Sequence, residues 1–176
     1  MKAIRECIKI QKMNPTNLKT GDILHCTGKH LLSKLIMKFT KSKFSHSALF
    51  IEIWGQPYVI DAQKDGVNLR PWYAWNEEYG YTIIAMRPTN FKPDSKEFSK
   101  RSMTKIGHTG YDFVGLLIRQ PIRLLFGKWN IKKNEGDKMF CSEYVAWTYS
   151  AEKSYKMSPE DLYNWCVLNN FTEVII

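Results

Sequence analysis

Cys141 is the residue of this sequence best placed to act as a nucleophile. It follows a polar, glycine-containing segment, KKNEGDKMF, and opens the apolar segment CSEYVAWTYSAE, which predicts a helix. A thiol at a helix N-terminus faces unpaired backbone N–H groups and the positive end of the helix dipole, and both lower its pKa. Free cysteines are also among the most buried residues, so a catalytic interpretation needs a base nearby.

His46 is the best of the four histidines for that base. It stands at the start of the β-rich segment 47–53, where a strand would hold the imidazole rigidly. His25 and His30 flank a predicted basic helix and are more simply explained as surface or core histidines. His108 lies in a turn beside two glycines, with no obvious partner.

A third candidate, Asp61, lies inside the otherwise apolar segment 58–62. Burying a carboxylate is costly unless it is paired, so a strand aspartate that faces a histidine has a physical reason to be there. Such a partner would fix the tautomer of His46 and leave the other ring nitrogen for the thiol. Glu52 is the alternative, because it follows His46 by six residues and an even offset places both on one strand face.

The elements that position these residues follow from hydrophobic periodicity. Gly55 and Pro57 separate two β-rich segments, which predicts a hairpin. The length suits a single domain, with residues 1–19 as an N-terminal extension. The predicted class is α+β, with helices packed on a small antiparallel sheet or barrel. Strands are predicted at 23–26, 47–53, 58–62, 67–69, 81–86 and 171–176. Helices are predicted at about 30–40, from 94 or 95 to 107, at 141–152, and from Pro159 to about 165 with Ser158 as the N-cap.

Taken in order along the chain, the motifs of this sequence resemble those of the YiiX/YaeF-like branch of the NlpC superfamily. Members of that branch are circularly permuted papain-like cysteine hydrolases. In the permuted group the histidine precedes the cysteine, as it does here. The resemblance covers roughly residues 20–165 and is carried by Gly21-Asp22-Ile23-Leu24, Ser45-His46, Asp61-Ala62, Gly110-Tyr111-Asp112-Phe113, Cys141-Ser142-Glu143 and Ser158-Pro159-Glu160.

The resemblance implies a role for each candidate residue. Cys141 would be the nucleophile, His46 the general base, and Asp61 the orienting residue, although the family commonly has a glutamate at this third position. The oxyanion would be held by the Cys141 backbone N–H and a second donor, for which Tyr111 is the candidate. The implied reaction is cleavage of an amide or ester through a thioester, without a metal or cofactor, in a cell-wall peptide or in an acyl lipid or N-acyl amide.

Two other functions stay open at this point. An acyltransferase similar to the lecithin:retinol acyltransferase group shares the permuted fold, but its cysteine lies in an NCEHF-like segment where this chain has FCSEY. A non-catalytic module that binds an anionic surface would use the basic segment 29–43. Residues 111–129, which are apolar with Arg119 and Arg123, could line a groove for an acyl chain or an anionic head group.

The charge balance bears on partners. Lys and Arg number 26 against 17 Asp and Glu, for a formal net charge of +9, which favours a polyanionic partner. No recognised nucleic-acid motif is present, so we expect an anionic membrane or a cell-wall surface in preference to nucleic acid. The set Cys7, His25, Cys26 and His30 lacks the usual spacing of zinc ligands.

Two segments bear on where in the cell the protein is located. Glu6, Lys9 and Lys12 interrupt the N-terminal region where a signal peptide needs an apolar run. Pro121 and its charged neighbours break the apolar stretch 111–129, which argues against a membrane span. We therefore expect a cytoplasmic protein that makes peripheral contact with a membrane or with the cell wall.

Overall fold

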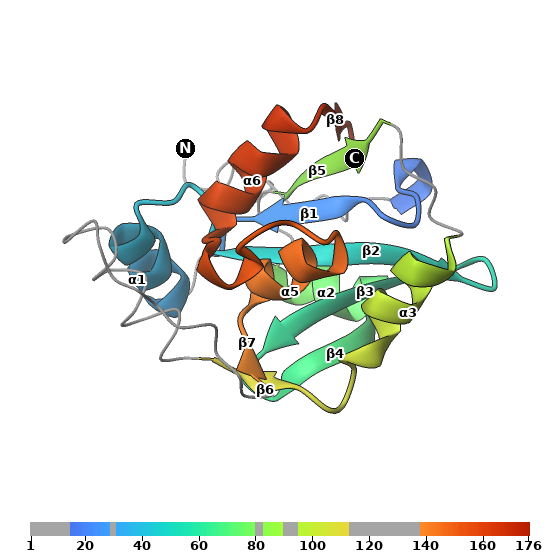
Figure 1. Cartoon of the computed structure of the whole chain (residues 1–176), viewed down its shortest axis with the longest axis horizontal. Helices are drawn as coiled ribbons and strands as arrows, with labels where there is room; N and C mark the ends of the chain where they lie inside the picture. Colours follow the sequence, from blue (N-terminus) through green and yellow to red (C-terminus); the bar gives the residue numbers. More distant parts are fainter. Residues whose placement is uncertain (1–14, 29–30, 80–82, 90–94, 113–137) are drawn as a thin grey trace, which may run out of the picture.

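The computed structural model of the chain describes residues 15–28, 31–79, 83–89, 95–112 and 138–176. Six strands form one sheet in the order β4-β3-β2-β1-β5-β8, and neighbouring strands are antiparallel (Figure 1). In the described part of the chain β4 and β8 form its two edges, so the sheet is open and is not a barrel. The strands are β1 (Ile23–Cys26), β2 (His46–Ile53), β3 (Gln56–Gln63), β4 (Gly66–Pro71), β5 (Ile83–Pro88) and β8 (Phe171–Val174).

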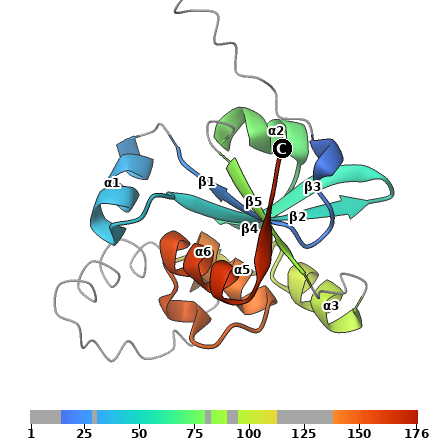
Figure 2. The ribbon, with the colours of Figure 1, turned by 90° about the horizontal axis from the view of Figure 1, so that it is seen from above.

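Helices lie on both sides of this sheet. In Figure 2, α2 lies on one side and α3, α5 and α6 lie on the other, while Figure 1 shows α1 at one end. A short parallel pair, β6 (Gly110–Tyr111) and β7 (Lys138–Met139), leads the chain into α5. The helices are α1 (Leu31–Thr40), α2 (Trp72–Tyr79), α3 (Lys96–Thr104), α5 (Cys141–Thr148) and α6 (Pro159–Leu168), with 3₁₀ turns η1 (Pro15–Asn17) and η3 (Ser154–Lys156).

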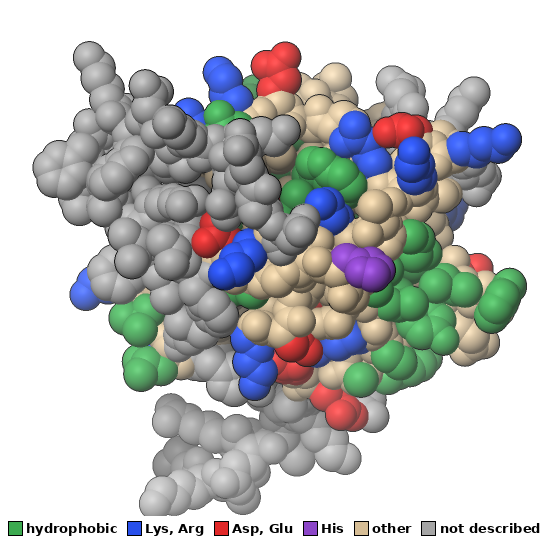
Figure 3. Space-filling view, turned by 60° about the horizontal axis from the view of Figure 1, so that its bottom comes forward, with side chains coloured by type: hydrophobic (Ala, Val, Ile, Leu, Met, Phe, Trp, Pro, Cys, Tyr) green, Lys and Arg blue, Asp and Glu red, His purple; other side chains and the backbone are tan. Residues whose placement is uncertain are grey.

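Charged side chains of both signs are exposed on the face of the molecule shown in Figure 3. Lys and Arg side chains are interspersed there with Asp and Glu, and hydrophobic side chains gather on one side. Among the described residues, no helix is both long enough and apolar enough to cross a bilayer.

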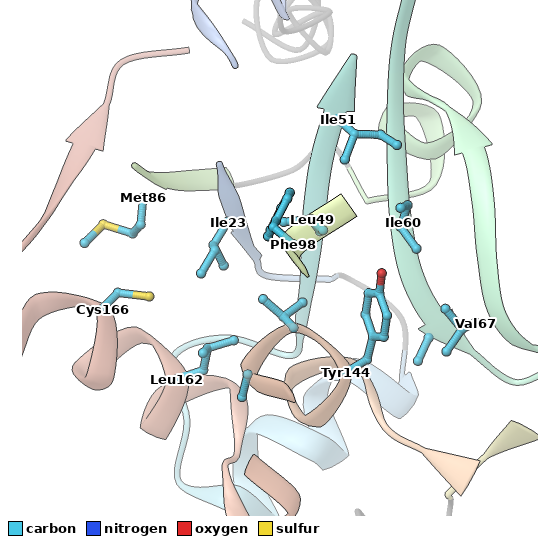
Figure 4. Close-up of a cluster of buried hydrophobic side chains, with 13 residues drawn as sticks. Ile23, Leu49, Ile51, Ile60, Val67, Met86, Phe98, Tyr144, Leu162 and Cys166 are labelled. Atoms are coloured by element: carbon cyan, nitrogen blue, oxygen red, sulfur yellow. The ribbon is translucent and has the colours of Figure 1, made fainter. Parts of the chain in front are cut away.

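The sheet is buried on both faces because successive side chains of a strand point to opposite sides. This explains why β2 is apolar over most of its length instead of alternating with polar residues. The layer under α5 and α6 is shown in Figure 4 and includes Ile23, Leu49, Ile60, Tyr144, Leu162 and Cys166. The layer under α2 includes Leu24, Ala48, Phe50, Val59, Trp72 and Trp75.

The α+β class and the antiparallel sheet predicted from the sequence are confirmed, and the strand at 23–26 has the predicted bounds. The predicted hairpin joins β2 to β3 through a two-residue turn at Trp54 and Gly55, both with positive φ. Such turns match the right-handed twist of the strands. The helix predicted with Ser158 as its N-cap and Pro159 as its first residue is confirmed: Ser158 Oγ accepts the Asp161 backbone N–H at 3.1 Å, and Asp161 accepts the Ser158 backbone N–H at 2.9 Å.

The sequence did not predict α2. The segment contains few strong helix formers, but Trp72 and Trp75 are three residues apart and therefore share one helix face. Both indoles are fully buried against the sheet. Burial of two large aromatic side chains on one face thus outweighs weak helix propensity.

Several predicted boundaries were wrong, among them the ends of α3, α6 and β8, and two others have a clear physical reason. The helix predicted over 141–152 ends at Thr148, because Ser150 has a φ of 58° and cannot continue it. Strand β5 runs on to Pro88, which a strand end tolerates because no ladder hydrogen bond is needed there. Predictions for residues 1–14, 30, 81–82, 94 and 113–137, including Arg119 and Arg123, lie outside the described residues.

Candidate active site

Cys141 is the first residue of α5, directly after β7 and Phe140. Its side chain is fully buried. Burial raises the pKa of the thiol. The charge of His46, a hydrogen bond from His46, and the backbone N–H groups of Ser47 and Ser142 lower this pKa by more than burial raises it, so it lies below the usual value. The N-terminus of α5 is fixed by Glu143, whose carboxylate accepts the Phe140 backbone N–H at 3.4 Å.

His46 is the first residue of β2 and pairs with Cys26 at the end of β1. Its Nε2 lies 2.7 Å from Asp61 Oδ2, which leaves Nδ1 as the ring nitrogen for Cys141. Burial lowers the pKa of His46, but the Cys141 thiolate and the Asp61 carboxylate outweigh burial and raise this pKa to about 10. The two opposite shifts favour the thiolate form of Cys141 beside the imidazolium form of His46.

Asp61 is completely buried in β3, and hydrogen bonds converge on its Oδ2. Besides His46, this oxygen accepts from Gln63 Nε2 at 3.0 Å, Arg70 Nη2 at 3.1 Å and Trp75 Nε1 at 3.0 Å. Burial raises the pKa of Asp61, but His46, Arg70 and Gln63 together bring it below its usual value. The carboxylate is consequently ionised at neutral pH and holds the imidazole in one orientation.

Beyond Asp61 the charges continue to alternate toward the surface. Arg70 of β4 also binds Glu78 of α2, with Nη1 and Oε2 2.8 Å apart. Side-chain exposure rises along this series, from 0% for Asp61 to 21% for Arg70 and 46% for Glu78. A series of alternating charges therefore extends from the buried thiol of Cys141 to the protein surface, through His46, Asp61, Arg70 and Glu78.

Sequence reasoning missed three of the groups that hold Asp61. Gln63 could have been found, because it follows Asp61 by two residues and so shares its strand face. Arg70 pairs across the sheet with Val59, two residues from Asp61, and a charged residue in a strand beside a buried aspartate was a usable signal. Trp75 lies in α2, which the sequence did not predict.

The structure does not bring the alternative residue Glu52 to His46. Glu52 is exposed near the opposite end of β2, roughly 20 Å away for six residues of strand. Tyr111 lies in β6 and packs beside Ile36 and Phe140, so its ring is near the residue that precedes Cys141. Its role as an oxyanion donor stays a prediction. His108 is exposed.

A second cysteine–histidine contact has the opposite electrostatic character. His25 Nε2 lies 3.9 Å from Cys166 Sγ, and His25 Nδ1 lies 3.2 Å from Ser47 Oγ. Burial lowers the pKa of His25 to about 3 and raises that of Cys166 to about 12, so both groups are neutral. Burial likewise raises the pKa of Cys26. Among the described cysteines, Cys141 alone has a lowered pKa.

These differences predict selective alkylation. Iodoacetamide is expected to modify Cys141 before Cys26 and Cys166, and to do so at a lower pH, because Cys141 alone has a pKa below that of an ordinary thiol. All three side chains have 0% exposure, so a difference between their alkylation rates reports ionisation of the thiol and not its accessibility. Peptide mapping by mass spectrometry across a pH series gives the three rates. A Cys141 rate that rises only above about pH 8 would contradict the assignment.

Solved structures of other proteins provide a comparison for this geometry. No model of a protein family matches the sequence, and no curated protein does. Among solved structures, the chain is similar to the crystal structure of metalloprotein yiiX from Escherichia coli O157:H7, with a TM-score of 0.59 and 21% sequence identity. The match covers 76% of this chain and 66% of the yiiX chain.

The yiiX structure is described as a metalloprotein, so we examined whether this chain has metal ligands. The described residues contain no group of three or more His, Cys, Asp or Glu side chains that could hold a metal ion. At this level of identity the likeness concerns the backbone arrangement. The open antiparallel sheet with its flanking helices therefore has the fold of yiiX, in agreement with the resemblance drawn from the sequence motifs.

Proposed function

We propose that this protein is a cysteine hydrolase that cleaves an amide or ester bond through a thioester intermediate. The observation that carries the proposal is the contact between Cys141 and His46, whose pKa values move in opposite directions. A thiolate is the nucleophilic form of cysteine, and an imidazolium beside it can protonate a leaving group. The His25–Cys166 contact lacks this separation of charge.

In the acylation step, Cys141 Sγ attacks the carbonyl carbon of the substrate and forms a C–S bond. The first backbone N–H groups of α5 have no partner within the helix, and that of Cys141 would stabilise the developing oxyanion. Tyr111 is the proposed second donor. His46 then gives its Nδ1 proton to the leaving nitrogen or oxygen as the C–N or C–O bond breaks, which leaves a thioester and a neutral imidazole.

In the deacylation step, the neutral imidazole of His46 accepts a proton from water while the water oxygen attacks the thioester. The C–S bond breaks, the acid product leaves, and the thiolate and imidazolium are restored. Asp61 remains ionised throughout and keeps Nε2 engaged, so Nδ1 carries the proton in both steps. Because Cys141 is fully buried, a substrate reaches Sγ only when the surrounding structure opens.

Two substrate classes are proposed, cell-wall peptides and acyl lipids or N-acyl amides. They are distinguished by incubating the protein with peptidoglycan fragments and with acyl phospholipids in separate reactions, followed by mass spectrometry of the products. Acid quenching is expected to trap an acyl group on Cys141, and Cys141→Ala is expected to form neither adduct nor product. Absence of both from the wild-type protein with every substrate would contradict the proposal.

The same reactions separate a hydrolase from an acyltransferase. An added alcohol or amine acceptor competes with water for the thioester, so the ratio of transfer product to free acid reports the preference of the enzyme. We expect the free acid to dominate. A transfer product in excess would assign the chain to acyl transfer with the same Cys141 and His46 chemistry.

A further inference from the structure

Helix α1 has an outward face made of two leucines and two lysines. Leu31, Lys34, Leu35 and Lys38 are spaced i, i+3, i+4 and i+7, which places them on one side of the helix. Leu31 is 75% exposed and Leu35 is 37% exposed, and both lysines are exposed, whereas Ile36 is 7% exposed. The helix therefore presents apolar and basic side chains together to its surroundings.

Positive charge predominates in the sequence around this face. The sequence from residue 23 to residue 51 contains five lysines and no aspartate or glutamate. Lys41 and Lys43, which follow α1, are exposed as well. Glu160 approaches from α6 and accepts the Lys43 backbone N–H at 2.8 Å, which offsets part of this charge. The surface is thus complementary to an anionic partner.

Other exposed apolar side chains differ in their surroundings. Trp54 is 98% exposed, but residues 44–63 contain no Lys or Arg, and the same holds for residues 157–176, which contain Leu168 and Ile175. Met103 of α3 has basic neighbours, but Arg101 there binds Glu97 at 2.7 Å and lies over the Trp147 ring. On the face shown in Figure 3 the two signs of charge are mixed.

The position of α1 connects this face to the candidate active site. Strands β1 and β2 pair at Cys26 and His46, so α1, which joins them, extends from the end of the sheet that carries His46 (Figure 1). The inner side of α1 contributes Ile36, which packs with Phe140 and Tyr111. One side of the helix therefore contacts the residue before Cys141, and the other carries the leucines and lysines.

We propose that α1 docks the protein on an anionic lipid bilayer. Leu31 and Leu35 enter the interfacial region, while Lys34 and Lys38 place their amines at the level of the phosphates. Docking in this orientation brings the Cys141 end of the sheet to the bilayer surface. Resting on the proposed hydrolase function, this docking selects acyl lipids over cell-wall peptides as the substrate class.

Sedimentation with vesicles tests the docking. The full chain is expected to bind vesicles of equal parts phosphatidylcholine and phosphatidylglycerol, to bind pure phosphatidylcholine weakly, and to dissociate at high salt. The double variant Lys34→Ala/Lys38→Ala is expected to bind roughly thirtyfold more weakly, and Leu31→Ser/Leu35→Ser at least about tenfold more weakly. Circular dichroism confirms that each variant is folded.

Matched controls carry the same chemical changes elsewhere. Lys96→Ala/Lys100→Ala removes the same charge from α3, and Leu168→Ser removes an exposed leucine from α6; both are expected to bind within about twofold of the wild-type protein. Equal weakening by the α3 and α1 lysine variants would show that net charge alone acts, and would overturn the proposal. Failure to bind the anionic vesicles, or full affinity of the leucine variant, would overturn it too.

Docking and hydrolysis can fail separately. Cys141→Ala is expected to bind vesicles like the wild-type protein, and Leu31→Ser/Leu35→Ser is expected to hydrolyse a short, water-soluble ester at the wild-type rate. Vesicle binding without hydrolysis of any substrate would retain the docking and overturn the hydrolase. Hydrolysis of the soluble ester without vesicle binding would do the reverse.

Discussion

Replacement of His46 with alanine is expected to lower kcat/KM by a factor on the order of 10⁴ and to raise the pKa of Cys141 above its usual value. His46 supplies the charge and the side-chain hydrogen bond that lower this pKa, and without them burial of the thiol acts with little opposition. In the proposed mechanism the imidazole also moves the proton in both chemical steps, so its loss removes the base as well as the thiolate. Steady-state kinetics on the identified substrate measure the first effect.

The pH profile of Cys141 alkylation measures the second effect and does not depend on knowing the substrate. In the wild-type protein the rate is expected to persist at mildly acidic pH, whereas in His46→Ala it should appear only at alkaline pH. His108→Ala is the control, because His108 is exposed. An unchanged alkylation profile in His46→Ala would show that His46 does not ionise the thiol.

Replacement of Asp61 with alanine is expected to lower the free energy of unfolding by about 3–5 kcal/mol. The change removes the carboxylate that His46 and Arg70 both bind, so their charges lose a buried partner. Trp75 and Gln63 lose their hydrogen-bond acceptor as well. Urea denaturation at neutral pH measures the loss. Asp65→Ala, in the exposed turn between β3 and β4, is the matched control and should change stability by less than about 0.5 kcal/mol.

The sign of the pH dependence follows from the lowered pKa of Asp61. A carboxyl group whose pKa is lower in the folded state stabilises the fold above its unfolded pKa, and this contribution is lost as the pH falls through the folded value. Wild-type stability should therefore decrease on acidification below about pH 4, and Asp61→Ala should lack this part of the decrease. Equal acid sensitivity in both proteins would show that Asp61 is not the group responsible.

The elements that carry Cys141, His46 and Asp61 were predictable because each depends on local pattern. A polar loop followed by an apolar run marked the start of α5, and β-rich segments interrupted by Gly55 marked the hairpin that brings β2 beside β3. The need of a buried carboxylate for a partner then linked Asp61 to a histidine. These inferences use spacing along the chain and the cost of burial, which a single sequence contains.

The surroundings of Asp61 were harder to predict because they depend on contacts distant in sequence. Trp75 donates to Asp61 only because α2 folds back over the sheet, and the burial of its two tryptophans forms that helix against local propensity. Arg70 reaches Asp61 through the register of β3 with β4. Periodicity identifies a strand but does not state which residue of the next strand lies beside it.

The hydrogen bond from Trp75 to Asp61 means that the candidate site draws on both layers of the protein. Cys141 comes from the layer of α5 and α6, whereas Asp61, which binds His46, accepts a hydrogen bond from a helix on the opposite side of the sheet (Figure 2). Partial unfolding that detaches α2 would dismantle the site while leaving α5 in place. Fragments that keep Cys141 and His46 but lack the α2 layer are therefore not expected to carry out the proposed reaction. The smallest unit expected to do so includes the whole sheet with helices on both faces.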